Sequence, residues 1–204
     1  MSKTIPLIAG QFYHIYNRGN NGEDLFCEPC NYAYFFELYI RHVYPLVETF
    51  AYCLMRNHFH LLVRPRTDLT GFQNLSGLGA SSGLDEPNYS QHFSNLFNAY
   101  TKALNKAYQR SGNLFERPFK RILVDSDRYL IHLLCYIHRN PQKHSFCDDF
   151  RDYPYSSYRA IVQDKNTRVM RAEVLSWFGS FKAFEEYHAQ FDEQQIQHLI
   201  EDDC

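Results

Sequence analysis

A predicted β-hairpin at residues 49–64 is the feature that most restricts the fold of this chain. Its return strand carries His58 and His60, two positions apart in a run that otherwise resembles a buried strand. Because side chains on a strand alternate between its faces, both imidazoles would lie on the same side of a sheet. A divalent metal ion bound by both rings is one explanation of such a pair. A solvent-facing or hydrogen-bonded pair without a metal is the other.

The remaining segments predict one α+β domain. Expected are a strand at 11–18, a helix at 31–47, the hairpin, a helix at 89–109, a strand at 120–124 and a helix at 126–140 that Pro141 ends. The order β-α-ββ-α-β-α fits a ferredoxin-like sandwich, an antiparallel sheet with helices packed on it. A Gly-, Ser- and Asn-rich loop is expected at 67–88, and short helices within 153–169 and 172–191. We therefore expect a main domain at 1–145 and a C-terminal helical addition at 146–204.

Composition sets the broad class of the protein. With 204 residues, 45% of them hydrophobic, the chain can build one sizeable core. No apolar run approaches the roughly 20 residues that span a bilayer, and the first residues have no signal-peptide core, so we expect a cytoplasmic protein with no membrane partner. The six cysteines are expected to be reduced, and the pair Cys27 and Cys30 lacks the second cysteine pair or the thioredoxin-like surroundings of a metal or redox site.

Charge is distributed unevenly along the chain. The net charge is −2, but residues 101–145 contain nine Lys or Arg against three acids, a local charge of +6. Such a segment is typical of a polyanion-binding face, although a solvated basic helix explains it equally well. The predicted track for single-stranded DNA consists of Lys102, Lys106, Arg110, Arg117, Lys120 and Arg121. Tyr108, Phe115 and Phe119 lie between these residues and are expected to stack on bases.

The predicted helix at 126–140 supplies a second set of polar side chains. Tyr136 and Asn140 are four residues apart, so the phenol and the amide share one face and can address the same ion or phosphate. Tyr129 is on that face too, but it lies about 10 Å along the helix from Tyr136, too far to share a ligand with Asn140. For most of the 16 tyrosines, packing in the core is the expected role.

Several motifs together resemble a known family. Residues 55–63 (MRNHFHLLV) and 136–141 (YIHRNP) resemble the histidine strand and the nucleophile helix of HUH-superfamily single-tyrosine transposases. Residues 13–20, 112–120 and 155–160 resemble the branch called REP-associated tyrosine transposases.

That resemblance implies a function for the individual residues. His58, His60 and Asn140 would be metal ligands and Tyr136 the catalytic nucleophile. The product would be a 5′-phosphotyrosine and a free 3′-hydroxyl on single-stranded or hairpin DNA, in DNA transposition or repeat-element processing. Two imidazoles and an amide oxygen suit Mg²⁺ or Mn²⁺. His14, on the first strand, would either support this site or face the core.

Two other functions are compatible with the sequence. One is a catalytically silent DNA- or RNA-binding regulator with the same fold. The other is a metallohydrolase that uses a metal-bound water, in which Tyr136 would only pack. Relatives include homodimers that exchange the tyrosine helix and monomers that do not, and the sequence is compatible with either arrangement.

Overall fold

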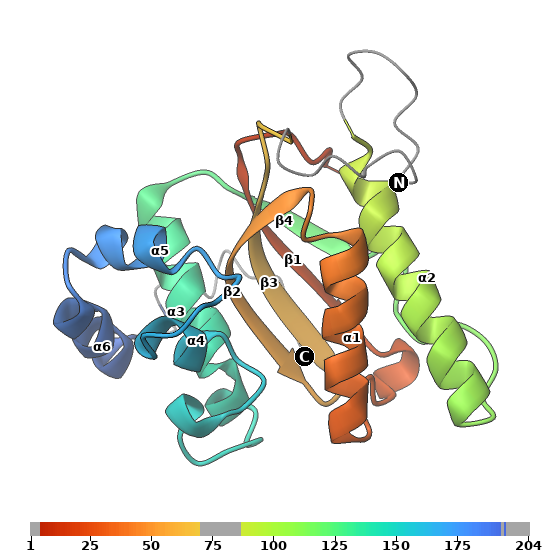
Figure 1. Cartoon of the computed structure of the whole chain (residues 1–204). Coiled ribbons are helices and arrows are strands. Elements are labelled where there is room, and N and C mark those ends of the chain that lie inside the picture. The colour runs from red at the N-terminus through yellow and green to blue at the C-terminus, as the bar shows by residue number, and fades with distance from the viewer. Residues whose placement is uncertain (1–4, 70–86, 193, 195–204) are drawn as a thin grey trace.

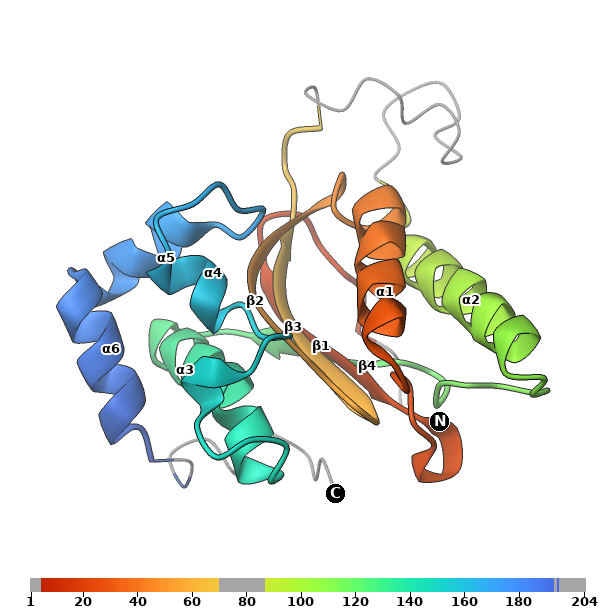
Figure 2. The same cartoon turned by 60° about the horizontal axis from the view of Figure 1, so that its bottom comes forward.

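The computed structural model describes residues 5–69, 87–192 and 194. Its centre is a four-stranded antiparallel sheet in the order β2-β3-β1-β4, formed by β1 (Phe12–Arg18), β2 (Val47–Met55), β3 (His58–Pro65) and β4 (Lys120–Val124) (Figure 1). Helices cover both faces of the sheet (Figure 2). The predicted α+β class and antiparallel sheet are confirmed. Of the predicted loop at 67–88, residues 70–86 lie outside the described residues.

The first layer of helices consists of α1 (Pro29–His42) and α2 (Tyr89–Ala107). Pro29 stands in the first turn of α1, where a missing backbone N–H costs no helical hydrogen bond. At the start of α2 the Asn88 side chain accepts a hydrogen bond from the Gln91 backbone. Both helices pack on the sheet face that carries Tyr13, Ile15, Phe59, Leu61 and Val63, which together form one core.

On the opposite face lies α3 (Asp127–Lys143), which begins at the predicted cap, Ser126. The predicted end of this helix at Pro141 is wrong, because the helix continues to Lys143. A proline removes one backbone donor, but within the last turn the next amides still find acceptors: His144 donates to the Asn140 carbonyl and Phe146 to the Pro141 carbonyl. The additional turn brings Lys143 onto the helix.

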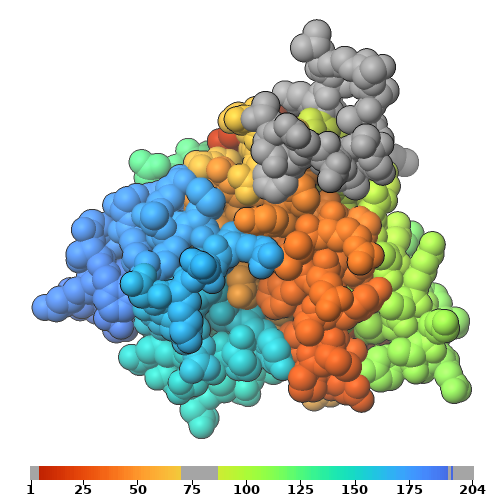
Figure 3. Space-filling model, viewed as in Figure 1, coloured from red at the N-terminus to blue at the C-terminus, as the bar shows by residue number. Residues whose placement is uncertain are grey.

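The C-terminal segment packs against α3 and forms isolated β-bridges with the edge strand β2, Thr49 with Val169 and Cys53 with Ser156 (Figures 1 and 3). It contains η3 (Phe150–Asp152), α4 (Tyr158–Val162), α5 (Arg171–Phe178) and α6 (Phe181–Gln190). A second core forms between these helices, α3 and the other face of the sheet, and it includes Leu62, Leu134, Ile137, Ile161 and Phe184. The helix α3 is therefore held between the sheet and the C-terminal segment.

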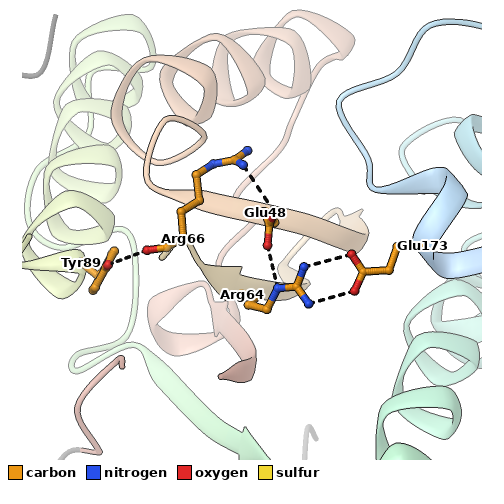
Figure 4. A network of polar contacts seen from close by, with 5 residues as sticks. All are labelled: Glu48, Arg64, Arg66, Tyr89 and Glu173. Atoms are coloured by element: carbon orange, nitrogen blue, oxygen red, sulfur yellow. Dashed lines mark hydrogen bonds and ion pairs between the residues drawn. The ribbon is translucent and has the colours of Figure 1, made fainter. Parts of the chain in front are cut away.

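Two polar networks join the C-terminal segment to the sheet. In the first, Arg64 of β3 donates from Nη1 and Nη2 to the two carboxylate oxygens of Glu173, at 2.8 and 2.9 Å, and from Nε to Glu48 at 2.6 Å (Figure 4). Figure 4 also shows Tyr89 donating to the Arg66 carbonyl. A bidentate arginine–carboxylate pair fixes orientation as well as distance, so α5 is tied to one point of β3.

The second network is a buried relay of two histidines and a serine. The ring of His138 on α3 contacts the ring of His188 on α6 through Nδ1 and Nε2 at 2.8 Å, and its Nε2 is 2.8 Å from the Ser157 hydroxyl. His188 Nδ1 is 2.8 Å from the Phe184 carbonyl and must donate to it. His188 Nε2 is then the acceptor for His138 Nδ1–H, so the His188 ring is neutral in this arrangement. The relay connects α3 to α6 and, through Ser157, to the Tyr52 backbone of β2.

Among the described residues, no helix is both long and apolar enough to cross a bilayer.

Candidate active site

The histidine pair lies on the sheet face that α3 covers. His58 and His60 are 8% and 1% exposed, and their ring centroids are 5.3 Å apart at an interplanar angle of 89°. Their neighbour Phe59 belongs to the opposite core, as the alternation along a strand requires. The predicted placement of both imidazoles on one face of the sheet is confirmed.

The helix α3 brings Tyr136 against this pair. The Tyr136 ring is 2% exposed and meets the His60 ring edge to face, with centroids 5.7 Å apart at 82°. Asn140 follows one turn later and is fully buried. Tyr129, the alternative on the same helix, is 4% exposed, and both tyrosines belong to the second core. Tyr136 therefore adjoins the histidines within a single chain.

Hydrogen bonds determine which ring nitrogen each histidine can offer to a ligand. His58 Nδ1 is 2.7 Å from Asn57 Oδ1, an acceptor, so Nδ1 carries the proton. His60 Nδ1 is 2.9 Å from Nε2 of His14, which lies on β1. His58 Nε2 is therefore the nitrogen that can bind a metal, and His60 Nε2 can do so in the tautomer whose Nδ1–H donates to His14. In both rings the partner at Nδ1 fixes the ring orientation, as is usual for metal-binding histidines. The contact places His14 beside the site.

Asn140 has an unusual side chain for a buried residue. Neither its amide oxygen nor its amide nitrogen has a hydrogen-bond partner among the described residues, although the side chain is fully buried. A buried polar group without a partner costs roughly 1–3 kcal/mol of stability. Such a cost is expected where a side chain is held ready for a ligand.

The electrostatics of the site favour a neutral His60. Burial is the main cause that lowers the pKa of His60 well below its ordinary value, and His58, His144 and Lys143 lower it further. A neutral imidazole is the form that binds metals.

Three further residues of the site were missed from the sequence. Tyr16 on β1 stacks on His14 and on His60, with centroids 4.6 and 5.7 Å apart. Lys143 holds Nζ 5.1 Å from the centroid of the Tyr136 ring, and the His144 ring is 5.0 Å from that of His58. Lys143 lies seven residues after Tyr136, which places both side chains on the same face of a helix. Lys143 was missed from the sequence because the predicted helix stopped before Pro141.

The side chains at this site fit a divalent metal ion. No three histidine, cysteine or acidic side chains in the described ranges are grouped so that they could hold a metal by themselves. The predicted set is different, because its third member is an amide. Two imidazole nitrogens and the amide oxygen of Asn140 are ligands that suit Mn²⁺ or Mg²⁺. That oxygen accepts no hydrogen bond from the described residues.

The predicted DNA track is only partly near this site. Lys102 and Lys106 are exposed on α2, on the other face of the sheet from α3. Arg110 forms an ion pair with Glu23. Lys120 pairs with Tyr16, which pairs with His60, so these three share one row and one face of the sheet.

The other two arginines of the track, Arg117 and Arg121, lie along the edge of the sheet. Arg117 donates to Asn98, and Arg121 lies over the Phe119 ring. Phe115 and Phe119 are 4% and 8% exposed and belong to the core, so the prediction that they stack on bases is wrong.

Cys27 and Cys30 are exposed thiols at the start of α1. The pKa of Cys27 is raised, mainly by burial, and that of Cys30 by its hydrogen bond to Glu28. A raised pKa is the opposite of what an activated thiol needs.

Comparison with known proteins supports the resemblance seen in the motifs. No family model matches the chain. A Haemophilus influenzae protein described as a REP-associated tyrosine transposase is 29% identical over 121 residues, 59% of this chain and 63% of that protein. The match thus spans somewhat less than two thirds of the relative.

Solved structures give the fold. The structure of a REP-associated tyrosine transposase bound to a REP hairpin matches with a TM-score of 0.58 and 17% identity, over 79% of this chain and 86% of that one. A bacterial tRNA(His) guanylyltransferase-like protein in complex with GTP is a more distant match, with a TM-score of 0.41 and 9% identity over 70% of this chain and 67% of that one. The chain resembles REP-associated tyrosine transposases in sequence and shares the fold of one whose structure is known.

Proposed function

We propose that this protein is a metal-dependent, single-tyrosine DNA endonuclease and strand transferase. The observation that carries the proposal is the edge-to-face contact of Tyr136 with His60, beside a buried Asn140 whose amide has no partner among the described residues. Core packing alone explains a buried tyrosine, but it does not explain an amide kept without hydrogen bonds one turn away.

In the proposed reaction the Tyr136 oxygen attacks a phosphodiester phosphorus. The bond from phosphorus to the 3′-oxygen breaks, the strand to the 3′ side stays attached through a 5′-phosphotyrosine, and the phenol proton leaves while the departing 3′-oxygen gains one. The new bond is again a phosphodiester, so the reverse attack by a 3′-hydroxyl can join strands without another energy source.

Charge at the phosphate has to be balanced during this attack. Mg²⁺ or Mn²⁺, held by His58, His60 and Asn140, would supply a Lewis acid for a phosphate oxygen. Lys143, whose Nζ lies 5.1 Å from the centre of the Tyr136 ring, adds a fixed positive charge on the nucleophile's side. His14 acts through His60 by holding its ring, as a positioning residue.

The proposed substrate is single-stranded or hairpin DNA, processed in transposition or in the maintenance of repeated elements. The solved relative is bound to a REP hairpin, and Lys120 continues the row of His60 and Tyr16 toward the sheet edge, where it is exposed for a phosphate. Arg121 lies on the other face of β4, where it donates to Ser90 of α2, and Arg117 precedes this strand. Lys102 and Lys106 of α2, with Arg110 after it, complete the proposed track.

We also propose that the two parts of the chain have different roles. Residues 1–145 would hold every group of the reaction, and the C-terminal addition at 146–204 would, through its described residues 146–192, act as a clamp that keeps α3 on the sheet. The contacts of α6 and Ser157 with His138 support this role.

The test is a search for a covalent protein–DNA adduct. The protein is incubated with labelled single-stranded hairpin DNA and Mn²⁺, then separated under denaturing conditions. Wild type should give an adduct that EDTA prevents, and Tyr136→Phe should give none. Tyr129→Phe is the matched control and should form the adduct as wild type does.

Two other outcomes would replace this proposal. Product strands that end in a free 5′-phosphate would indicate a metal-bound water as nucleophile. Hairpin binding that is insensitive to EDTA and to His58→Ala, without any cleavage, would indicate a silent DNA-binding regulator.

A further inference from the structure

A pocket of about 660 Å³ opens directly beside His58. One wall is the loop after β1, with Asn20 and Asn21, and another is formed by His144 and Phe146 after α3. The side chains of Arg18 and Glu116 also line it. The pocket therefore begins at the candidate active site and continues away from it along the end of β1.

The loop that forms one wall of the pocket has a fixed backbone conformation. Gly19 is needed there, because a Cβ at this position would lie 1.8 Å from the Glu23 carbonyl oxygen. Asn21 adopts a left-handed conformation, φ 55°, which asparagine tolerates better than most residues. Backbone hydrogen bonds from Gly19 to the Asn57 carbonyl and from Asn20 to the Leu114 carbonyl hold the loop on the hairpin turn and on the segment before β4.

The acidic side chain in the pocket is held equally firmly. The Glu116 backbone is held on both sides: its N–H donates to the Arg18 carbonyl at 3.0 Å, and its carbonyl accepts from Asn17 Nδ2 at 3.1 Å. Its Oε1 accepts from Arg18 Nε at 2.6 Å, and the Glu116 side chain is 30% exposed. The carboxylate is thus fixed at the wall and still accessible.

Distance along a DNA strand decides what can occupy this pocket. Successive nucleotides follow each other at about 3.4 Å in a duplex strand and somewhat more when a strand is extended. A phosphodiester that meets Tyr136 and His58 has its neighbouring nucleotide within that reach. The space next to His58 is where that neighbour must lie.

The chemistry of the wall fits a base better than a phosphate. A fixed carboxylate repels phosphate oxygens, but it accepts hydrogen bonds from base N–H groups, and the guanidinium of Arg18 donates to base oxygens. The rings of His144 and Phe146 offer faces for stacking. Guanine presents two adjacent N–H donors and a carbonyl oxygen on its unpaired edge. Thymine presents one N–H between two carbonyl oxygens, which the carboxylate would repel.

We infer that this pocket binds one unpaired nucleobase next to the cleaved phosphate, and that the Arg18–Glu116 pair selects guanine over thymine there. The inference rests on the proposed function for the position of the phosphate. It assigns Glu116 a role in sequence recognition and none in the chemistry.

The experiment uses a hairpin DNA library with random single-stranded flanks and measures base preference in two ways. Adducts formed by the full chain with Mn²⁺ are sequenced to give base frequencies around the cleavage position. Library molecules retained without cleavage by Tyr136→Phe are sequenced as a separate pool. Each measurement is repeated with Glu116→Gln, which keeps the size of the side chain but can donate as well as accept. Asp164→Asn is the control, because Asp164 is an exposed partner of Arg171 away from the pocket.

One position within two nucleotides of the cleaved bond should show guanine enriched over thymine. Glu116→Gln should reduce that ratio about fivefold or more, and Asp164→Asn should leave it unchanged. An unchanged ratio in Glu116→Gln, in both pools, overturns the inference. If wild type forms no adduct but Glu116→Gln still changes the retained pool, the proposed cleavage fails and the base pocket stands.

Discussion

At the scale of single residues, Asn140 distinguishes this site from an ordinary core. Its buried amide makes no hydrogen bond with the described residues, whereas the amide of Asn31, 7% exposed, accepts from the backbone of Cys27 and of Glu28. Both asparagine side chains are thus buried, but only that of Asn31 has hydrogen-bond partners among the described residues. The difference supports the proposal that Asn140 is kept for a ligand at a cost in stability.

Replacing Asn140 by leucine should stabilise the metal-free protein. The substitution keeps the approximate size of the side chain and removes an unsatisfied amide, so the free energy of unfolding in EDTA should rise by about 1–3 kcal/mol. Urea unfolding measures this value. Asn31→Leu should lose stability under the same conditions, because two backbone donors lose their acceptor. Mn²⁺ should stabilise wild type and should not stabilise Asn140→Leu. A lower free energy of unfolding for Asn140→Leu than for wild type in EDTA would contradict the account.

Lys143 should affect the rate of cleavage more than the binding of DNA. Its Nζ lies 5.1 Å from the centre of the Tyr136 ring, where a positive charge stabilises negative charge on the phenol oxygen and the phosphate. We expect Lys143→Met to slow adduct formation about tenfold or more in single-turnover assays. Lys182→Met is the control, since Lys182 is 86% exposed and pairs with Glu186 on α6. Equal rates for the two variants would remove Lys143 from the site.

Residues close in sequence were predicted well, and distant partners were not. The shared strand face of His58 and His60, and the one-turn spacing of Tyr136 and Asn140, follow from local rules, namely alternation along a strand and the turn of a helix. The roles of these residues came from the family resemblance and stay a prediction. The contact of His14 with His60 depends on the pairing of β1 with β3, between residues 46 positions apart. The Arg18–Glu116 pair joins residues 98 positions apart, and no local pattern encodes it.

At the scale of elements, α3 is the part that assembles the site. Its polar face carries Tyr136 and Asn140 toward β3, and its opposite side packs on the C-terminal helices. The relay of His138, His188 and Ser157 ties this helix to α6 and to the segment before α4.

This relay should make stability depend on pH. Burial lowers the pKa of His188 to about 4 and that of His138 well below its ordinary value. Between pH 4 and the unfolded pKa of about 6.5 the unfolded chain binds more protons, so the free energy of unfolding should fall as the pH falls through this window. For His188 the full loss is about 3 kcal/mol.

Urea unfolding at pH 7.5 and at pH 5 measures the effect of the relay. His188→Gln should show a smaller difference between the two pH values, since an amide oxygen can accept from His138 and does not titrate. An equal or larger difference in that variant would assign the pH dependence to other groups.

The bounds of the elements show where local patterns mislead. The β4 strand has the predicted bounds, 120–124, but α1 ends at His42, five residues before the predicted end at 47. Val43 and Leu46 are buried in the turn after α1. They extend the helical spacing of apolar residues beyond the point where the helix ends. Tertiary packing, and not helix periodicity, keeps these side chains inside.

At the scale of the whole molecule, the sandwich brings the candidate metal ligands and the candidate nucleophile together in one chain. The sheet contributes His58, His60 and His14, and the helix on its second face contributes Tyr136 and Asn140. The C-terminal segment covers the outer side of that helix. Exchange of α3 between two subunits would require breaking the relay and the second core.

A complementation assay tests whether each chain acts alone. Mixing Tyr136→Phe with His60→Ala should restore no adduct formation, because neither chain has a complete site. Exchange of α3 would rebuild one intact site per dimer and restore part of the activity. Restored activity in the mixture would contradict assembly within one chain.

The most direct test of the central claim is to locate the DNA attachment on the protein. The adduct is digested with nuclease and trypsin, and fragmentation mass spectrometry finds the residue that carries the remaining nucleotide. Trypsin should release residues 129–139, a peptide that contains both Tyr129 and Tyr136. The account predicts the nucleotide on Tyr136 in a reaction that requires the divalent metal. A nucleotide on Tyr129 or on any other residue, or cleaved DNA with no nucleotide on the protein, would contradict it.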